Sequence, residues 1–371
     1  MGIVVGLPHG GASEKDYQVQ FGKNISIQVE VRAPFLPAEW ALQSGIQLTW
    51  PHAGTDWAYM LEEVQKCFVA IATEITKHEL LLIVTPDPDE VKKQISATVN
   101  MENVRFLKCG TNDTWARDHG AITMLDADGP SLLDFTFNGW GLKFASDKDN
   151  EITRRAVETG VLKGKYVNRL GFVLEGGSIE SDGAGTLLTT SECLLSPNRN
   201  GQMNKAEIEE FLRSTFHLER VLWLDYGYLT GDDTDSHVDT LARFCSTNTI
   251  VYVQCNDVQD EHYEELHKME EQLKTFRTLN GKPYRLLALP MVDKIEVEGE
   301  RLPATYANFL IMNDVVLCPT YNQPENDIRA KEVLQEAFPN HEIIGIDCRA
   351  LIKQHGSLHC VTMQYPVGVL K

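Results

Sequence analysis

Apolar residues recur at the spacing of an amphipathic helix from about residue 57 to residue 77, where Leu61, Val64 and Phe68 fall on one face. A short apolar run, 80–84, follows directly. A run of this length between polar residues is typical of a buried strand. The pattern therefore predicts a helix and then a buried strand near the start of the regular part of the chain.

The same alternation of helix and strand returns along the chain at intervals of roughly 50 to 70 residues, with hairpin patterns between the units. The predicted helix and strand pairs are 88–97 with 104–107, 205–216 with 221–224, 259–278 with 285–289, and 325–338 with 343–346. The predicted hairpins are 177–182 with 186–190, residue 244 with 250–254, and 309–311 with 315–319. The spacing predicts a repeated strand-helix-strand module, although no repeat of individual residues is visible.

The regular part of the chain has no linker rich in Pro, Gly or Ser, so we expect residues 36–371 to form a single α/β domain. A doubly wound parallel sheet is the competing fold, but no GxGxxG or other phosphate-binding loop supports it. Residues 1–35 are glycine-rich and polar, with a weak strand pattern at 25–31. We interpret them as a leader of unknown role, with flexibility as one reading.

Charge narrows the range of partners. The 371 residues carry 34 Lys and Arg against 53 Asp and Glu, a formal net charge of −19. Such a surface repels nucleic acid and anionic membranes and attracts cations, although solubility alone accounts for much of the acidic charge in intracellular proteins. No apolar run approaches the length of a membrane span, and the first eleven residues do not resemble a signal peptide. We expect no nucleic-acid or membrane partner, and the sequence leaves the choice between monomer and homo-oligomer open.

The cysteines indicate a reducing compartment. The chain has eight cysteines, none in a CxxC pair, and most lie in apolar runs where a free thiol behaves as a small buried hydrophobe. Neither a disulfide framework nor a zinc cluster is expected, and a cytoplasmic location fits this pattern.

Polar residues interrupt otherwise apolar strand patterns at five places, which makes these places candidates for chemistry. The five segments are Trp115 to Asp118, Glu175 to Gly177, Gly231 to Asp239, Tyr306 to Phe309, and His355 to Cys360.

His237 and Asp239 stand two positions apart, which places both side chains on one face of an extended strand, together with Asp235 if the strand begins there. One functional reading is a divalent-metal site, and another is an acid/base histidine beside a substrate-binding carboxylate. A turn in which Asp side chains bond their own backbone explains Asp232 and Asp233, but it leaves His237 and Asp239 unexplained.

Cys360 lies in a predicted strand, 358–363, after Gly356 and Ser357. Taken alone it reads as a buried, inert thiol. The glycine permits a close backbone approach, and distant acidic and histidine segments supply the partners that a cysteine nucleophile needs. His359 alternates to the opposite face of such a strand, so we do not expect it to be the base.

Two carboxylates complete the candidate set. Asp118 follows Trp115 and Arg117, and a structural ion pair with Arg117 is the simplest alternative to a functional role. Glu175 ends an apolar run and precedes two glycines. Burying such a carboxylate unpaired is costly, so it needs a cationic or donating partner, and a protonated histidine would serve.

An ordered set of motifs resembles the agmatine deiminase family, which is related to bacterial peptidylarginine deiminases among the guanidino-group-modifying enzymes. The resemblance covers about residue 36 to the end of the sequence. The motifs are PAEW at 37–40, TWPH at 49–52, WARD at 115–118, FNGWG at 137–141, EGGSIESDGAGTLLTTSECLLS at 175–196, GDDTDSHVD at 231–239, YANF at 306–309 and LHCVTMQYP at 358–366. The resemblance implies a five-bladed, pseudo-symmetric α/β propeller of the pentein type, with the site at its centre and one motif from each blade.

The resemblance also implies a mechanism without metal or organic cofactor. Asp118 and Asp239 would hold the guanidinium of a small cationic substrate, and Cys360 would attack its carbon. His237, kept cationic by Glu175, would protonate the departing ammonia and then activate water. Trp115 would stack on the substrate, and Asn308 would position it.

Agmatine is the expected substrate, with N-carbamoylputrescine and ammonia as products. Deimination of arginine or peptidyl arginine, and amidino transfer, are the alternatives within this chemistry. A protein that binds a divalent metal or another ligand through its Asp and His residues is the alternative from another class.

Overall fold

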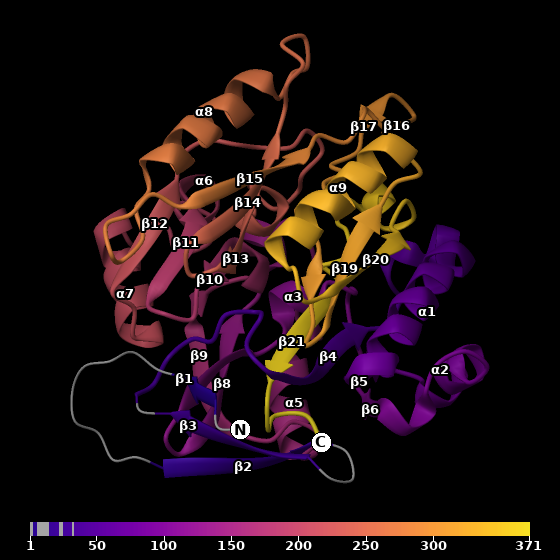
Figure 1. Cartoon of the computed structure of the whole chain (residues 1–371). Coiled ribbons are helices and arrows are strands. Elements are labelled where there is room, and N and C mark those ends of the chain that lie inside the picture. The colour runs from indigo at the N-terminus through magenta and orange to yellow at the C-terminus, as the bar shows by residue number, and fades with distance from the viewer. Residues whose placement is uncertain (1–2, 6–14, 22–24, 32) are drawn as a thin grey trace.

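Five sheets with one common pattern dominate the computed structural model, which describes residues 3–5, 15–21, 25–31 and 33–371 (Figure 1). In each sheet the first strand is antiparallel to the second, and the second is parallel to the third. The strands are β21 (Thr362–Pro366), β4 (Gln43–Thr49), β5 (Leu80–Thr85) and β6 (Val104–Lys108) in one sheet; β7 (Ile122–Asp126), β8 (Gly129–Thr136) and β9 (Lys165–Val173); β10 (Ile179–Ser181), β11 (Thr186–Thr190) and β12 (Arg220–Leu224); β13 (Ala242–Ser246), β14 (Thr249–Gln254) and β15 (Arg285–Pro290); and β18 (Leu310–Ile311), β19 (Val315–Thr320) and β20 (Glu342–Asp347).

A helix joins the parallel strands of every one of these sheets, because parallel neighbours need a long crossover connection. Figure 1 shows α1, α7, α8 and α9 on the outside, with the strands between them. The connecting helices are α1 (Leu61–His78), α2 (Pro88–Ile95), α5 (Ile152–Glu158), α7 (Lys205–Phe216), α8 (Tyr263–Thr275) and α9 (Pro324–Ala337). The expected α/β class and its strand-helix-strand module are therefore confirmed.

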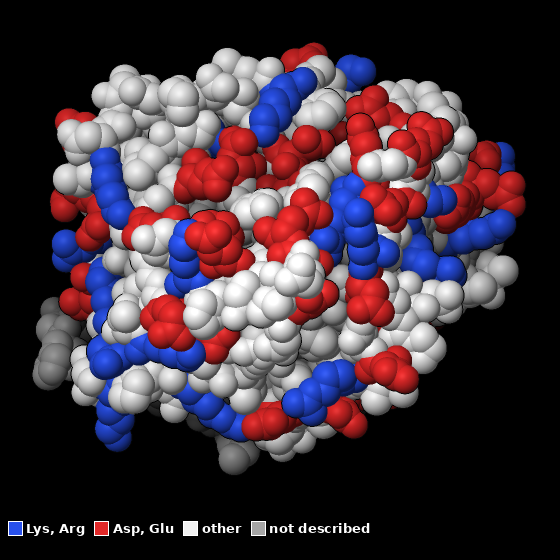
Figure 2. All heavy atoms as spheres, turned by 90° about the horizontal axis from the view of Figure 1, so that it is seen from above, with Lys and Arg blue, Asp and Glu red and all other residues white. Residues whose placement is uncertain are grey.

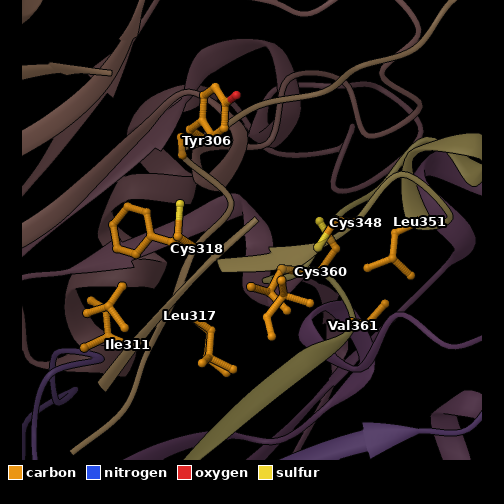
Figure 3. Packing of buried hydrophobic residues seen from close by; sticks show 14 of the residues in the cluster. Tyr306, Ile311, Leu317, Cys318, Cys348, Leu351, Cys360 and Val361 are labelled. Carbon is orange, nitrogen blue, oxygen red and sulfur yellow. The ribbon is translucent and has the colours of Figure 1, made fainter. Parts of the chain in front are cut away.

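Local sequence accounts for these helices and for their burial. Helix α7 begins at a capping box. The Asn204 side chain accepts from the backbone N–H of Glu207, and the Glu207 side chain accepts from the backbone N–H of Asn204. Helix α1 turns Val64 and Phe68 onto the sheet, and β5 is almost entirely buried because helices and neighbouring strands cover both of its faces. Figure 3 shows apolar side chains of β18 and β19 near Leu351 and Val361, with Cys360 among them.

Smaller elements complete the described chain. Strands β1 (Ile3–Val5), β3 (Ile25–Val31) and β2 (Lys15–Phe21) form a separate sheet, which confirms the strand predicted at 25–31. The glycine-rich start predicted as part of a leader lies largely outside the described residues, so the leader remains a prediction. A short hairpin joins β16 (Glu296–Val297) to β17 (Glu300–Arg301).

Two predicted strands were wrong. His237 and Asp239 lie at a short 3₁₀ helix, η5 (Val238–Thr240), and Cys360 lies in a turn two residues before β21 begins. The period-two pattern alone could not distinguish these turns from strands, since apolar residues flank both segments.

Acidic groups outnumber basic groups in the sequence and are prominent on the surface. Figure 2 shows Asp and Glu side chains spread across the face seen from above, with Lys and Arg side chains between them. No helix within the described ranges combines the length and the apolar character that crossing a bilayer requires.

Candidate active site

Each of the five sheets is preceded by a turn that carries one of the predicted site residues. Short helix α3 (Ala116–His119) carries Asp118 before β7, and η4 (Gly176–Ser178) follows Glu175 before β10. Helix η5 carries Asp239 before β13. Two further turns carry Asn308 before β18 and Cys360 before β21. Residues spread over more than 240 positions therefore reach the same place because the five sheets repeat one local arrangement.

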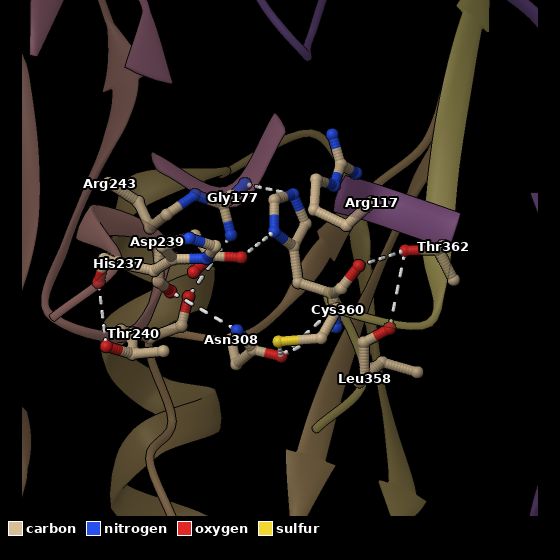
Figure 4. Close-up of polar contacts among 12 residues, drawn as sticks. Arg117, Gly177, His237, Asp239, Thr240, Arg243, Asn308, Leu358, Cys360 and Thr362 are labelled. Carbon is tan, nitrogen blue, oxygen red and sulfur yellow. Dashed lines mark hydrogen bonds and ion pairs between the residues drawn. The ribbon is translucent and has the colours of Figure 1, made fainter. Parts of the chain in front are cut away.

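Direct contacts join the five turns in a closed ring. The backbone N–H of Arg117 donates to the carbonyl of Cys360 at 3.1 Å, and the N–H of Gly177 donates to Asp118 Oδ1 at 3.0 Å. The amide of Asn308 reaches the Asp239 carbonyl at 3.5 Å, and its Oδ1 accepts from the Cys360 N–H at 3.2 Å (Figure 4). The positions of the side chains are therefore set by backbone held in neighbouring sheets.

The turn at η4 meets the turn at η5 at Gly177, which completes the ring. A Cβ atom at this position would lie 2.6 Å from His237 Nδ1, 2.9 Å from Asp118 Oδ1 and 3.2 Å from Asp239 Oδ2. Three functional side chains thus converge on one bare face of a glycine. The second glycine of the EGG motif is explained by this convergence, since any side chain would displace the groups around it.

Asp118 is held by two donors. Its Oδ1 accepts from the Gly177 N–H, and its Oδ2 accepts from the indole N–H of Trp140 at 2.9 Å. Burial, and then the negative charge of Asp239, raise the pKa of this carboxyl group well above its ordinary value. The site therefore carries a carboxyl group that a bound cation would ionise.

Asp239 differs because a histidine supports it. His359 Nδ1 lies 2.7 Å from Asp239 Oδ2, whereas Asp239 Oδ1 is buried and has no hydrogen-bond partner among the described residues. Burial raises the pKa of Asp239, but the hydrogen bond and the charge of His359 outweigh it, so the net pKa lies below the ordinary value. Asp239 is therefore an ionised carboxylate with one acceptor oxygen available.

The ring of His237 is buried, and neither of its nitrogens makes a hydrogen bond within the described chain. Its Nδ1 lies 3.7 Å from Asp118 Oδ1. Burial lowers the pKa of His237 to about 3, against the opposing effect of Asp239. The imidazole is consequently neutral at physiological pH when the site holds no cation, which disagrees with the expectation that Glu175 keeps His237 cationic.

Glu175 has a partner that the sequence did not suggest. Both of its carboxylate oxygens accept from Nε of buried Arg199, at 2.9 and 3.0 Å. Arg199 also donates to Asp235 Oδ2 at 2.6 Å and to the carbonyl of Thr234 at 2.8 Å. Glu175 does need a cation, as expected, but that cation is arginine; His237 lies within 4.8 Å of the carboxylate without a hydrogen bond to it.

Cys360 is a buried thiol at the base of a pocket. Its Sγ lies 3.3 Å from Asn308 Oδ1, which also accepts from the N–H groups of His359 and Cys360. Asn308 therefore holds the turn that carries the thiol, and its role in positioning substrate stays a prediction. Burial, followed by the charges of Asp239 and Asp118, raises the pKa of the Cys360 thiol well above its usual range.

The pocket above this thiol is acidic and aromatic. It is lined by Trp115 and Trp140, by Cys360, and by five aspartates: Asp56, Asp113, Asp118, Asp232 and Asp233. Trp115 packs on Trp57 with ring centroids 5.7 Å apart, and its ring leaves no room for a Cβ at Gly356. Trp115 thus reaches the pocket as predicted, and the glycine before the thiol does permit a close approach. None of the lining residues in the described chain is Lys or Arg.

The structure adds residues that the sequence analysis did not single out. Trp140, Arg199 and Arg243 all contact the predicted carboxylates or their neighbours. Trp140 stood inside the FNGWG motif, so its signal was present but had no assigned chemistry. Arg199 and Arg243 left no pattern of their own, because a buried arginine is recognised only by the carboxylates that surround it in space.

Two clusters of ligand-like side chains exist within the described residues, one of Glu175, Cys193 and His237 and another of Glu39, Glu180 and His359. Arg199 pairs with Glu175, and Arg243 pairs with both Glu39 and Glu180. Arginine therefore already supplies the positive charge that the carboxylates of each cluster need. Asp235, considered for a metal site with His237, instead binds Lys143 and Arg199.

Comparison with known families gives a match over nearly the whole chain. The model of the Porphyromonas-type peptidyl-arginine deiminase family matches residues 35–366. Agmatine deiminase of Pseudomonas fluorescens is 31% identical over 356 residues, which cover 90% of this chain and 95% of that protein. Agmatine deiminase of Stutzerimonas stutzeri is 30% identical, covering 91% and 96%.

Solved structures agree with this match. A Porphyromonas gingivalis protein provisionally named an arginine deiminase is 52% identical, with a TM-score of 0.86 over 91% of this chain and 100% of that one. A cysteine-to-serine variant of the C. jejuni agmatine deiminase with bound substrate is 39% identical, with a TM-score of 0.84 over 91% and 97%.

Proposed function

The chain belongs to the Porphyromonas-type peptidyl-arginine deiminase family, and from this premise we propose that it is a hydrolase that converts agmatine and water to N-carbamoylputrescine and ammonia. The observation that carries the proposal has two parts: the Cys360 thiol and Asp118 line one acidic pocket, and Asp118, Asp239 and His237 converge on the bare face of Gly177. A planar cation can be held there by two carboxylates, with its carbon in reach of sulfur.

Asp118 and Asp239 bind the guanidinium in this mechanism. Asp239 offers its unpartnered Oδ1, and Asp118 offers the remaining lone pairs of oxygens already oriented by Gly177 and Trp140. Both groups are fixed before substrate arrives, so little entropy is lost on binding. Trp115 and Trp140 form aromatic walls that suit a cation with an apolar stem.

Proton transfer begins only when the cation is present. Its charge offsets the two aspartates, which lowers the pKa of the Cys360 thiol, and neutral His237 takes the thiol proton. The thiolate adds to the guanidinium carbon, and the His237 imidazolium then protonates the departing nitrogen, which leaves as ammonia.

Hydrolysis of the amidino-sulfur intermediate regenerates the enzyme. Neutral His237 accepts a proton from water, the resulting hydroxide adds to the same carbon, and the carbon–sulfur bond breaks. The His237 imidazolium then returns its proton to the departing thiolate, and the ureido product loses its hydroxyl proton to solvent. Glu175 lies close enough to the imidazolium to offset its charge each time it forms. Arg199 holds this buried carboxylate in place and lowers its pKa, although burial has the larger effect and raises it.

The proposed architecture is a five-bladed propeller. The five sheets, each with its crossover helix, would serve as blades of one domain covering residues 36–371, with the ring of turns at the centre. The eight free, buried cysteines support a reducing, cytoplasmic setting for this enzyme.

Agmatine is favoured over arginine because the pocket is lined by aspartates and, within the described chain, by no lysine or arginine that would pair with an α-carboxylate. The family description and the named arginine deiminase from Porphyromonas gingivalis make arginine and peptidyl arginine the competing substrates. Ammonia release from agmatine, arginine and a peptidyl arginine, compared as kcat/KM under one condition, tests the assignment. A higher value for either arginine substrate would overturn agmatine and leave the cysteine mechanism standing.

A further inference from the structure

His359, the residue before the thiol, lies between two carboxylates in the buried centre of the molecule. Its Nδ1 is 2.7 Å from Asp239 Oδ2, and its Nε2 is 2.7 Å from Glu39 Oε2 and 3.1 Å from Arg243 Nη2. The side chains of His359, Asp239 and Glu39 are buried. The two nitrogen-to-oxygen distances are those of short hydrogen bonds.

The surroundings of Glu39 fix this carboxylate beside the ring. Glu39 Oε2 also accepts from Arg243 Nη2 at 2.6 Å, and its Oε1 accepts from the Ile311 N–H at 2.7 Å. The pKa of Asp239, on the other side of the ring, is lowered, so Asp239 is an acceptor and His359 Nδ1 donates to it.

Arg243 fixes the far end of this chain of groups. It pairs with Glu180 and donates to the carbonyls of Ala307 and Phe309, at 3.1 and 2.7 Å. The backbone N–H of His359 is itself bound to Asn308 Oδ1 at 2.8 Å. His359 is thus fixed through both its backbone and its ring, and it can orient the Asp239 carboxylate that it binds.

We propose that His359 is a positioning residue for the reaction: held between Glu39 and Asp239, it fixes the Asp239 carboxylate so that Oδ1 faces the guanidinium. This inference rests on the proposed binding of guanidinium by Asp239. His359 binds Oδ2 and leaves Oδ1 without a partner among the described residues, which is the division that a carboxylate needs to bind one edge of a planar cation. The PAEW motif gains a function through Glu39, which contacts the second ring nitrogen of the histidine.

Two substitutions test the contacts of His359 Nδ1 and His359 Nε2 separately. In His359→Asn the side-chain amide nitrogen stands near the position of Nδ1 and can still donate to Asp239. In His359→Gln the amide nitrogen stands near Nε2, so the contact with Glu39 is kept and the one with Asp239 is lost. Both are made in a Cys360→Ser background, and agmatine binding is measured by titration calorimetry.

The expected result is an unequal loss. His359→Gln weakens agmatine binding about 10- to 100-fold, because a charge-assisted hydrogen bond to the binding carboxylate is removed. His359→Asn loses clearly less. In the enzyme that retains Cys360, His359→Gln raises KM more than it lowers kcat, since most of the lost interaction is already made in the bound substrate. His267→Asn, an exposed change on α8, is the matched control.

Three outcomes bear on the inference differently. Equal binding by His359→Gln and the Cys360→Ser parent, or equal losses for Gln and Asn with a matching fall in melting temperature, would overturn the positioning role alone. Failure of the parent to bind agmatine, arginine or peptidyl arginine would overturn the proposed function and this inference together. If both His359 variants fail to fold, Glu39→Gln provides the second test: a KM unchanged from wild type would overturn the positioning of Asp239 through Glu39 and His359.

Discussion

At the scale of single residues, the proposed mechanism keeps the Cys360 thiol protonated, and so unreactive, until a cation enters the site. Asp118 and Asp239 lie on either side of the bare face of Gly177, and both raise the pKa of the Cys360 thiol after burial has already done so. A thiolate beside two carboxylates is unfavourable, whereas a guanidinium between them makes it favourable. Reactivity and substrate binding are therefore coupled through charge.

The first prediction concerns the nucleophile. Replacing Cys360 with Ala or Ser should lower kcat by about 1000-fold or more, because both halves of the reaction pass through the sulfur. Agmatine binding should persist, since the carboxylates remain. Ammonia release measures the fall in kcat, and calorimetric titration measures the retained binding of agmatine. Cys318 is unsuitable as a control position, because its thiol is buried in the core. Substantial turnover by Cys360→Ala would refute the assignment.

The second prediction concerns the two binding carboxylates. Asp118→Asn and Asp239→Asn should each raise the dissociation constant of agmatine about 10- to 100-fold or more, because an amide N–H would face the N–H groups of the substrate. Asp89→Asn, an exposed change in the first turn of α2, should have no effect. Titration of each variant in the Cys360→Ser background gives the comparison, and near-normal affinity in either site variant would remove that residue from the binding site.

The third prediction follows from the raised pKa of Asp118. In the empty site this group holds its proton to a pH above its ordinary pKa, and a bound guanidinium favours the ionised form, so binding should release a proton to the buffer. Release should disappear as the pH rises past the pKa of the empty site, because the carboxyl is then already ionised. His237, with a pKa of about 3, contributes none near neutrality.

Calorimetric titrations of Cys360→Ser with agmatine in buffers of different ionisation enthalpy measure this proton. Asp118→Asn in the same background should abolish the release. Release that persists unchanged in that variant would show that another group supplies the proton.

Sequence alone identified the residues that carry reactive groups but not those that hold them. Cys360, His237, Asp118 and Asp239 were found because reactive side chains stood where apolar ones were expected, and all four lie together. Arg199 and His359 were missed or set aside, since their meaning depends on carboxylates 24 and 120 positions away. Pairing across such distances is decided by packing of sheets and leaves no local spacing to detect.

At the scale of elements, the decisive feature is the turn before the first strand of each sheet. The turns at α3, η4 and η5 point polar side chains inward, and the strands that follow anchor their backbone. Irregular backbone of this kind can be placed accurately only where a regular element holds it.

The fourth prediction tests one such turn. Gly177→Ala would place a methyl group 2.6 to 3.2 Å from His237, Asp118 and Asp239, so the catalytic side chains must move. We expect kcat/KM to fall about 100-fold or more, because displacements near 1 Å are costly in a preorganised site. Gly171→Ala is the matched control, since its Cβ meets nothing within 4 Å. Activity assays with thermal melts of both variants compare them, and a fully active Gly177→Ala protein would contradict the crowded geometry.

Helices and buried strands were predicted well because each has a period that its own residues display. Helix α7 was predicted with the bounds that it has, and the strand after it to within one residue. The turns at His237 and Cys360 were predicted as strands, since two or three polar residues between apolar runs carry no period. Their shape is imposed by hydrogen bonds to neighbouring sheets, such as that from Arg117 to Cys360.

At the scale of the whole molecule, the charge of −19 surrounds a pocket that is itself acidic. Such a field attracts a dication more strongly than a zwitterion with a side-chain charge. The fifth prediction is that kcat/KM for agmatine falls about threefold or more as ionic strength rises from about 0.02 M to about 0.3 M, and falls more steeply than for arginine. Steady-state rates at several salt concentrations measure both slopes, and equal slopes would assign the preference to contacts inside the pocket.

The α/β class and the recurrence of one module could be predicted, because helix and strand patterns return at regular intervals. The pairing of β21 with β4 could not be predicted. The two strands lie at opposite ends of the regular part of the chain, and nothing in either segment identifies the other as its partner. Only the family resemblance led to an arrangement in which all five motifs meet.

The pairing of β21 with β4 also sets the order in which the molecule becomes active during its synthesis. The carboxylates and His237 leave the ribosome first, and Cys360 follows them by more than 100 residues. The turn that carries the thiol is anchored only when β21 docks beside a strand made more than 300 residues earlier. A growing chain therefore carries both proposed binding carboxylates well before it has the sulfur, whereas His359, which orients Asp239 in the inference above, is made together with Cys360 and is anchored by the same pairing of strands.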